Sequence, residues 1–125
     1  MHKSRLGEIT IDCNTDDLEG AVKFWSAALG VKAKAYEDET FSAYHLEAAA
    51  NELDINIQAV KHPSRVHIDI ETDDIEAEVQ RLEKLGATRV GEELRWWVMQ
   101  APSGHRFCVA RVCRSNFETE ANEWP

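Results

Sequence analysis

The chain carries two copies of one strand-and-helix segment, and this duplication limits the folds open to it more than any other feature. The sequence EITIDCNTDDLE at 8–19 is matched by RVHIDIETDDIE at 65–76, and both copies run on to a Leu-Gly pair, at 29–30 and 85–86. Chance similarity of unrelated segments is disfavoured, because the match is unbroken through Thr-Asp-Asp. Two copies in 125 residues predict one domain, 1–125, built by duplication.

Each copy has the pattern of a strand followed by a helix. Apolar and polar residues alternate before Thr-Asp-Asp, which is the period of a strand with one apolar face. The Thr and Asp residues can cap a helix, whose positive end favours acidic groups. Apolar residues then recur at helical spacing, and Gly30 and Gly86 stand where a left-handed C-cap is needed. The pattern predicts helices over 17–29 and 74–85.

Three more strands are expected after each helix. The expected strands are short runs bounded by turn residues, at about 6–13, 31–37, 41–48, 53–59, 65–71, 88–91, 94–100 and 106–112. The order is β-α-β-β-β, twice, with modules at about 6–60 and 65–112. Residues 1–5 are expected to be a loose lead-in. The tail 114–125 is expected either to fray or to dock through Phe117 or Trp124.

The composition narrows the class of protein. The formal charge is −9 with no visible basic face, so no nucleic-acid partner is expected. The first residues lack an apolar run and no segment approaches a membrane span, so neither a signal peptide nor a membrane partner is expected. Three cysteines without metal-type spacing suggest reduced thiols and a cytoplasmic location.

The polar faces of the strands hold the candidate site residues. The apolar alternates, Val66 and Ile68 among them, are expected to face the helices, so the polar residues would meet in one cavity between the half-sheets. Plain solvation of the polar faces is the alternative. Trp96 and Trp97 point to opposite faces, and Trp97 is taken as the ligand-binding one. The other ligand-binding candidates are Thr10, Asp12, Asn56, Gln58, Arg106 and Cys108.

His67 and Asp69 are the candidates for catalysis. A histidine in a pocket can act as a general base or hydrogen-bond partner near neutral pH, and Asp69 could orient it. A buried structural role is the alternative for His67. Cys108 could equally be a small core residue, and Arg106 could form an internal ion pair.

Three stretches carry a resemblance to a known superfamily: DLEGAVKFWSAALG at 17–30, RVHIDIETDDIEAEVQRLEKLGA at 65–87 and WVMQAPSGHRFCV at 97–109. They resemble the glyoxalase / bleomycin-resistance / dioxygenase superfamily, also called vicinal-oxygen-chelate proteins, over about 6–112. The resemblance implies an α+β fold in which two βαβββ modules form a curled mixed sheet around a concave pocket. It also implies a homodimer.

The resemblance also implies a metal site, and the ligand positions can be compared with this chain. Enzymes of the superfamily hold a divalent metal with residues that correspond here to Thr10, Gln58, His67 and Cys108. His67 alone is a good ligand in its place, and a hard metal would need carboxylates that these positions lack. We therefore expect no bound metal and no other cofactor.

These observations predict a glyoxalase-like small-molecule-binding protein with an unidentified organic ligand and a second copy of itself as partners. A metal-dependent lyase, isomerase or dioxygenase with an atypical ligand set is the alternative. A protein-interaction module is a third hypothesis.

Overall fold

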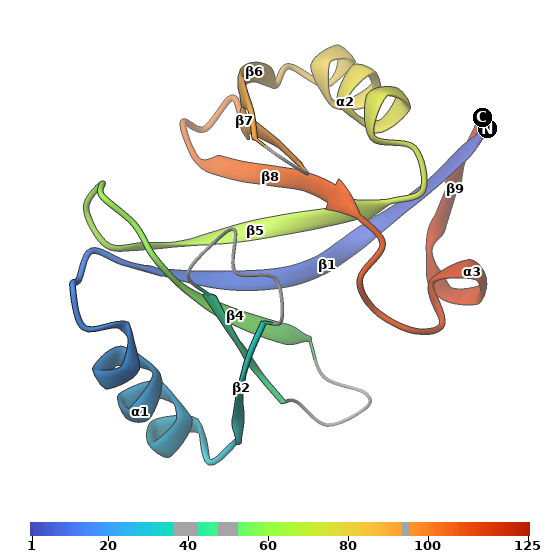
Figure 1. Cartoon of the computed structure of the whole chain (residues 1–125). Helices are drawn as coiled ribbons and strands as arrows, with labels where there is room; N and C mark the ends of the chain where they lie inside the picture. Colours follow the sequence, from blue (N-terminus) through green and yellow to red (C-terminus); the bar gives the residue numbers. More distant parts are fainter. Residues whose placement is uncertain (37–42, 48–52, 94–95) are drawn as a thin grey trace. The chain divides into compact units, whose positions relative to one another are not determined.

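The computed structural model describes residues 1–36, 43–47, 53–93 and 96–125. The chain divides into two compact units, one of residues 8–66 and one that joins residues 1–7 to 67–125. They are called the 8–66 unit and the 67–125 unit below. Each combines strands with a helix of at least ten residues, so the predicted α+β class is confirmed (Figure 1).

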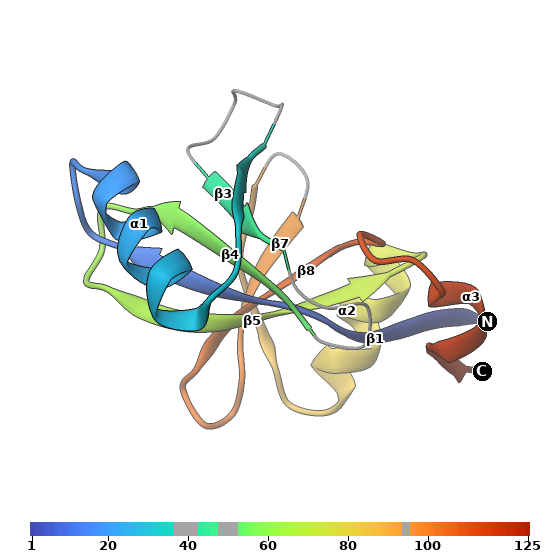
Figure 2. The same cartoon turned by 90° about the horizontal axis from the view of Figure 1, so that it is seen from below.

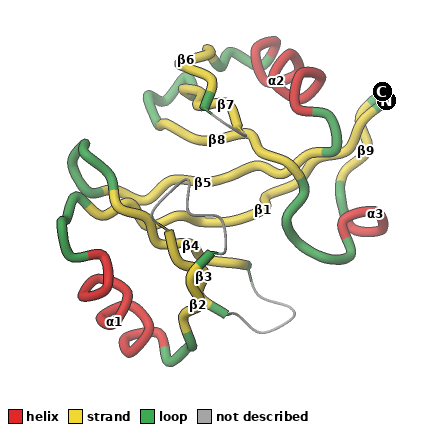
Figure 3. The backbone as a smooth tube through the Cα atoms, in the orientation of Figure 1, coloured by secondary structure: helices red, strands yellow, loops and turns green. Residues whose placement is uncertain are grey.

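The 8–66 unit has the predicted strand-helix-strand-strand-strand order. Its elements are the second half of β1 (His2–Cys13), α1 (Leu18–Leu29), β2 (Ala33–Ala35), β3 (Ala43–Leu46) and β4 (Asp54–Ala59) (Figure 3). The strands follow the order β2-β3-β4-β1. β1 and β4 are parallel, whereas β2, β3 and β4 are antiparallel neighbours. The outer ends of the predicted strands at 37, 41–42 and 48 lie outside the described residues.

The helix α1 begins and ends where the sequence predicts. The Asp17 side chain accepts a hydrogen bond from the Gly20 amide at 3.0 Å, which caps the first turn. Gly30 ends the helix with a φ of 70°, a left-handed conformation that glycine adopts without strain. The helix packs its apolar face on the sheet through Val22, which shares a buried cluster with Leu46 and Ile57. The prediction that the apolar alternates of the strands face the helices is therefore confirmed for Ile57 of β4.

The 67–125 unit repeats that order and extends it. Its elements are the first half of β1, β5 (Arg65–Thr72, of which two residues belong to the other unit), α2 (Ile75–Lys84), β6 (Thr88–Glu92), β7 (Trp96–Gln100), β8 (Arg106–Arg111), α3 (Phe117–Glu120) and β9 (Asn122–Trp124). The strand order is β1-β5-β8-β7-β6, and β9 pairs with β1. β5 and β8 are parallel, whereas β6, β7 and β8 are antiparallel neighbours. Residues 94–95 of the predicted strand 94–100 lie outside the described residues.

The helix α2 also matches its prediction. Asp74 caps it by accepting from the Ala77 amide at 3.1 Å, and Gly86 follows it with a φ of 109°. Val79 and Met99 form the centre of a buried cluster beneath the helix. A lipid bilayer could not be crossed by any helix in the described parts of the chain, because none is long and apolar enough.

The prediction that residues 1–5 are loose is wrong, because β1 begins at His2. The His2 ring nitrogen Nε2 lies 2.8 Å from Glu78 Oε1. The Lys3 amide donates to the Asp73 carboxylate at 2.8 Å. These partners are polar and distant in sequence. The segment itself has no apolar alternation, so its sequence did not predict a strand.

The tail 114–125 docks against β1 and does not fray, which decides between the two alternatives given for it above. β9 pairs antiparallel with the start of β1, and both chain ends lie at one edge of this unit (Figure 2). Phe117 is buried, with the Arg5 guanidinium 5.4 Å from its ring centre. The Trp124 ring lies 3.9 Å below the Arg81 guanidinium, and its Nε1 donates to Ser4 Oγ at 2.8 Å. Cation–π contacts and a paired indole therefore hold the tail.

The prediction that Val66 and Ile68 face a helix is wrong. These side chains are 62% and 48% exposed. The buried cluster beneath α2 reaches β5 only at Ile70, so the first half of the strand has no helix over its apolar face.

Glu71 is a buried carboxylate that joins three distant segments of the 67–125 unit. It accepts from Arg5 Nε at 2.6 Å and from the Cys113 and Arg114 amides at 2.9 and 3.1 Å. Gly7 permits this close packing, since a Cβ there would lie 3.0 Å from Glu71 Cβ. Burial raises the pKa of the Glu71 carboxyl, but the hydrogen bonds from Cys113, Arg5 and Arg114 outweigh burial and hold the pKa below its ordinary value.

We expect Glu71→Gln to lower the free energy of unfolding at pH 7 by about 1–3 kcal/mol, because it removes a charged acceptor from buried donors. A lowered folded-state pKa stabilises the protein above the ordinary value of about 4.3, and the stabilisation is lost as pH falls through the folded value. The difference between variant and wild type should therefore shrink between pH 5 and pH 3. Urea unfolding followed by tryptophan fluorescence measures both.

The matched control for this test is Glu118→Gln, because the Glu118 side chain is 78% exposed and its ion pair with Lys3 is at the surface. An exposed pair contributes little, so this variant should differ from wild type by less than about 0.5 kcal/mol. Equal losses in the two variants would contradict the anchoring role of Glu71.

Candidate functional site

The polar face of the 67–125 unit brings three of the predicted site residues together. Alternation along β5 places His67 and Asp69 on the face opposite Ile70, which packs beneath α2. In the parallel pairing of β5 with β8, Asp69 lies beside Cys108. Donor atoms of His67, Asp69 and Cys108 all lie within 4.8 Å of one another.

His67 and Asp69 form a close pair. The Nε2 atom of His67 lies 3.1 Å from Asp69 Oδ1, and their side chains are 8% and 14% exposed. A carboxylate only accepts hydrogen bonds, so this contact favours a proton on Nε2. In the neutral ring Nδ1 then carries the lone pair, which can accept a hydrogen bond or a proton. The predicted orienting role of Asp69 is consistent with this geometry.

The aromatic residue on this face is Trp96, not Trp97 as we predicted. Trp97 packs against the buried cluster beneath α2, and the Arg89 guanidinium lies 5.1 Å from its ring centre. Val98 is the cross-strand neighbour of Cys108, so Val98 and Trp96 share the face of the polar cluster. Two adjacent tryptophans have the same propensity, and only the position of α2 decides which one is core.

Arg106 is not part of this cluster. Its side chain is exposed, and its Nε donates to Gln100 Oε1 at 3.0 Å near the start of β8. It pairs with a neutral amide on the adjacent strand rather than in the internal ion pair considered from the sequence.

In the 8–66 unit, the predicted polar residues line up across β1 and β4. Thr10 lies beside Asn56, and Asp12 lies beside Gln58. All four therefore lie on the face opposite Ile57, which packs beneath α1. That they form one cavity together with His67 and Cys108 stays a prediction.

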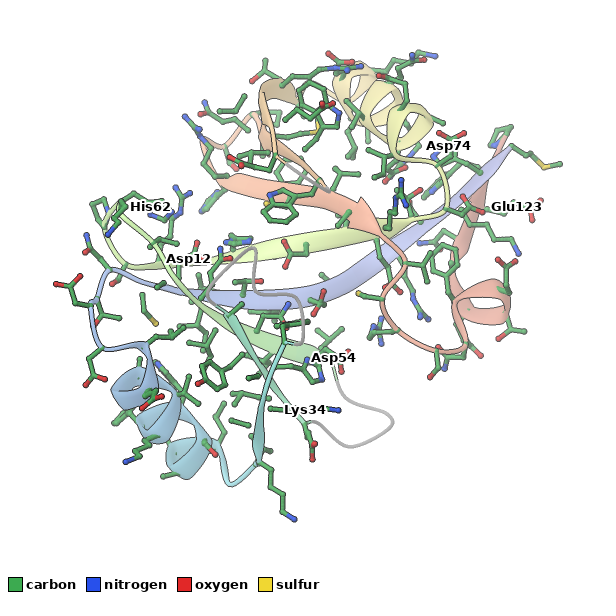
Figure 4. The ribbon with its side chains drawn as sticks, in the orientation of Figure 1. Asp12, Lys34, Asp54, His62, Asp74 and Glu123 are labelled. Carbon is green, nitrogen blue, oxygen red and sulfur yellow. The ribbon has the colours of Figure 1, made fainter. Side chains whose placement is uncertain are left out.

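Asp12 is the centre of a local network. It is almost fully buried and accepts from Gln58 Nε2 at 2.6 Å. Arg65 Nε lies 3.6 Å from its other oxygen, and His62 Nε2 lies 4.0 Å from the same atom (Figure 4). These contacts compensate the carboxylate, as burial of a charge requires.

Sequence reasoning missed a second group of donors in the same unit. Glu8, His45 and Asp54 place donor atoms within 4.8 Å of one another. His45 lies in the expected strand 41–48 and was not among the candidate site residues. Its weakly alternating strand gave no register, and the register of β3 against β4 is what brings it to the polar face.

A pocket of about 490 Å³ opens elsewhere, in the 67–125 unit. Its lining residues are Thr72, Asp73, Ile75, Arg111 and Val112. It therefore involves the ends of β5 and β8 rather than the His67 cluster.

The comparison with protein families decides the identity of the fold. Residues 8–110 match the family model described as "Glyoxalase-like domain". The chain belongs to the glyoxalase-like family. The resemblance to the vicinal-oxygen-chelate superfamily is thereby confirmed. No curated protein matches the sequence.

Solved structures share the glyoxalase-like fold. A hypothetical protein of Bacillus halodurans C-125 has a TM-score of 0.58 at 16% identity, covering 90% of this chain and 99% of that one. Methylmalonyl-CoA epimerase of Mycobacterium tuberculosis has a TM-score of 0.60 at 14% identity, covering 86% and 87%. The 2,3-dioxygenase LapB of Pseudomonas sp. KL28 has a TM-score of 0.57 at 18% identity, covering 97% of this chain but 46% of that one. At these identities, the likeness concerns the fold alone.

The donor set of the glyoxalase-like chain can be compared with what a metal requires. In the 67–125 unit, an imidazole, a carboxylate and a thiol converge. Zinc accepts all three donor types, whereas a hard ion such as Mg²⁺ prefers oxygen ligands and Asp69 supplies the carboxylate of this group. The cluster does not fit a carboxylate-rich hard-metal centre.

The opposite orientations of the two tryptophans can be tested by stability. We expect Trp97→Ala to lower the free energy of unfolding by about 2–4 kcal/mol, because it removes a ring from the cluster beneath α2. Trp96→Ala should cost less, since Trp96 lies on the other face. Urea unfolding monitored by circular dichroism compares the variants, and a larger loss for Trp96→Ala would contradict the assignment.

Proposed function

We propose that this glyoxalase-like protein binds a small organic molecule on the polar face of β5, β7 and β8. The observation that carries the proposal is the His67–Asp69 pair at 3.1 Å beside Cys108. Burying a polar or charged pair costs free energy unless hydrogen bonds or ion pairs compensate it. Groups of this kind concentrate at functional sites.

The chemistry of this face describes the ligand. His67 can hydrogen-bond a hydroxyl, carbonyl or carboxyl group, while Trp96 and Val98 offer an apolar wall along β7. The ligand we propose therefore has one polar group attached to a planar or apolar body. Partly exposed Cys108 lies beside the polar group's position and adds a polarisable contact.

A catalytic role would use the same atoms. With Nε2 paired to Asp69, Nδ1 of His67 is suited to accept a proton from a bound molecule. A second candidate function is a metal-dependent lyase, isomerase or dioxygenase. Its support is that the three donor atoms lie within 4.8 Å of one another, and that fold neighbours include an epimerase and a dioxygenase. That no catalytic metal binds at the His67 cluster stays a prediction, and the metal content of wild type compared with His67→Ala tests it.

We also propose a homodimer in a reducing, cytoplasmic environment. Val66 and Ile68 present apolar side chains on the first half of β5, and a second copy of the chain would cover them. Cys13, Cys108 and Cys113 are reduced rather than disulfide-bonded, which supports the proposed location.

The ligand proposal predicts quenching of tryptophan fluorescence by a planar carbonyl or carboxylate compound drawn from a fragment library. His67→Gln and Asp69→Asn should weaken the binding of that compound by roughly 5–150-fold, the effect of leaving a buried polar partner unsatisfied. Trp96→Phe should reduce the quenching amplitude. His105→Gln is the control, because His105 is exposed in the turn before β8 and should leave binding unchanged. Unaltered affinity in the first two variants would sink the proposal.

The dimer is tested by light scattering at increasing protein concentration. Wild type should show twice the chain mass, and Ile68→Lys should shift it toward the monomer because it places a charge in the apolar contact. Val90→Lys is the control, since Val90 is also an exposed apolar strand residue but lies on β6. A monomeric wild type, or equal effects of both variants, would contradict the proposal.

A further inference from the structure

Two carboxylates lie side by side on the polar face of the 8–66 unit. Glu8 in β1 and Asp54 in β4 are paired residues of the parallel ladder. Glu8 is buried, and the Asp54 side chain is 24% exposed. Like charges at directly opposed positions destabilise a sheet unless a positive group lies between them. The strand pairing therefore brings two carboxylates close enough to share one cation.

The amide of Asn56 sets the orientation of the third group, His45. Its nitrogen Nδ2 donates to the Glu8 carboxylate, which can only accept. Its oxygen Oδ1 therefore faces the other way, where it accepts from the Tyr36 hydroxyl and lies 3.3 Å from His45 Nδ1. An amide oxygen cannot donate, so Nδ1 of His45 carries a proton.

This orientation makes the other ring nitrogen a ligand atom. In the neutral imidazole, a proton on Nδ1 leaves the lone pair on Nε2. A hydrogen bond from the non-ligating nitrogen to a carbonyl oxygen is the arrangement that commonly orients metal-bound histidines. Nε2 of His45 lies toward Asp54, 4.0 Å from its Oδ1.

The spacing suits an ion held between these atoms. A separation of 4.0 Å is too long for a hydrogen bond between Nε2 and Oδ1. Two ligands at about 2.0–2.2 Å from one tetrahedral ion are about 3.3–3.6 Å apart. The three donor atoms lie within 4.8 Å of one another, so closure around an ion needs side-chain shifts of roughly 1 Å.

We propose that Glu8, His45 and Asp54 bind one divalent cation of the zinc and manganese class. One imidazole with two carboxylates favours ions that accept both nitrogen and oxygen, over Mg²⁺ and Ca²⁺. The proposal is independent of the proposed small-molecule function, because it uses none of the residues of that site. Lys34 is exposed and pairs with His45 in the β2–β3 ladder, so its charge would weaken the binding of a cation through solvent.

The experiment is a Co²⁺ titration of the full chain after chelator treatment, followed by absorption. Co²⁺ is a coloured substitute for Zn²⁺. Binding at the proposed site should give visible d–d bands without a thiolate-to-metal charge-transfer band, because the site contains no sulfur. Binding at Cys108 would give that band. Zn²⁺ should displace the Co²⁺, and a tenfold excess of Mg²⁺ should not.

The variants locate the ion. His45→Gln and Asp54→Asn keep side-chain size and should each weaken Co²⁺ binding by at least tenfold. His67→Gln and Cys108→Ser should leave it unchanged, and Lys34→Gln should leave it unchanged or strengthen it. Circular dichroism and thermal unfolding confirm that each variant is folded.

A wild-type measurement avoids dependence on the variants. During a Zn²⁺ titration followed by NMR of the imidazole nitrogens, the His45 signals should shift while those of exposed His105 stay. Three results would overturn the proposal: a charge-transfer band lost in Cys108→Ser, unshifted His45 signals at millimolar Zn²⁺, or equal Co²⁺ affinity in wild type and Asp54→Asn. The second would mean that a proton on His45 balances the two carboxylates instead.

Discussion

The buried carboxylate of Glu71 is the interaction on which the 67–125 unit depends. It joins β5 to Arg5 in β1 and to the backbone at 113–114, which follows β8. Without it, the Nε–H of Arg5 and the amides of Cys113 and Arg114 would lose their acceptor in a place with little water. The same contacts direct the chain after β8 toward β1, so that Phe117 is buried and β9 pairs with the strand.

Much of the fold could be predicted because its signals are local. The caps Asp17 and Asp74, the terminal glycines and the alternation of β1, β4 and β5 depend on short stretches of sequence. Where the answer depends on distant partners, prediction failed. Residues 2–5 form a strand because they contact Glu78, Asp73 and the tail. Val66 is exposed because the cluster beneath α2 reaches β5 only at Ile70.

The candidate site shows the same division. Parity placed His67, Asp69 and Cys108 on one face, and the parallel register of β5 with β8 brings them together. The matching register in the other unit sets Asp12 beside Gln58, where an amide, an arginine and a histidine surround the carboxylate. Similar backbone positions thus carry different chemistry. Parity could not choose between Trp96 and Trp97 or find His45, because both depend on how separate elements pack.

β1 contributes its first half to one unit and its second half to the other. During synthesis the 8–66 unit has all of its residues once residue 66, a few positions after β4, has left the ribosome. The 67–125 unit is still incomplete at that point, because the first half of β1 pairs with β5 and β9. Its partner residues there lie more than 60 and more than 110 positions later in the sequence. One edge of residues 1–7 can pair once β5 has been made, whereas the edge that pairs with β9 stays open until Trp124 has been made. Their hydrophilic sequence is a safe one for a strand edge that stays open so long.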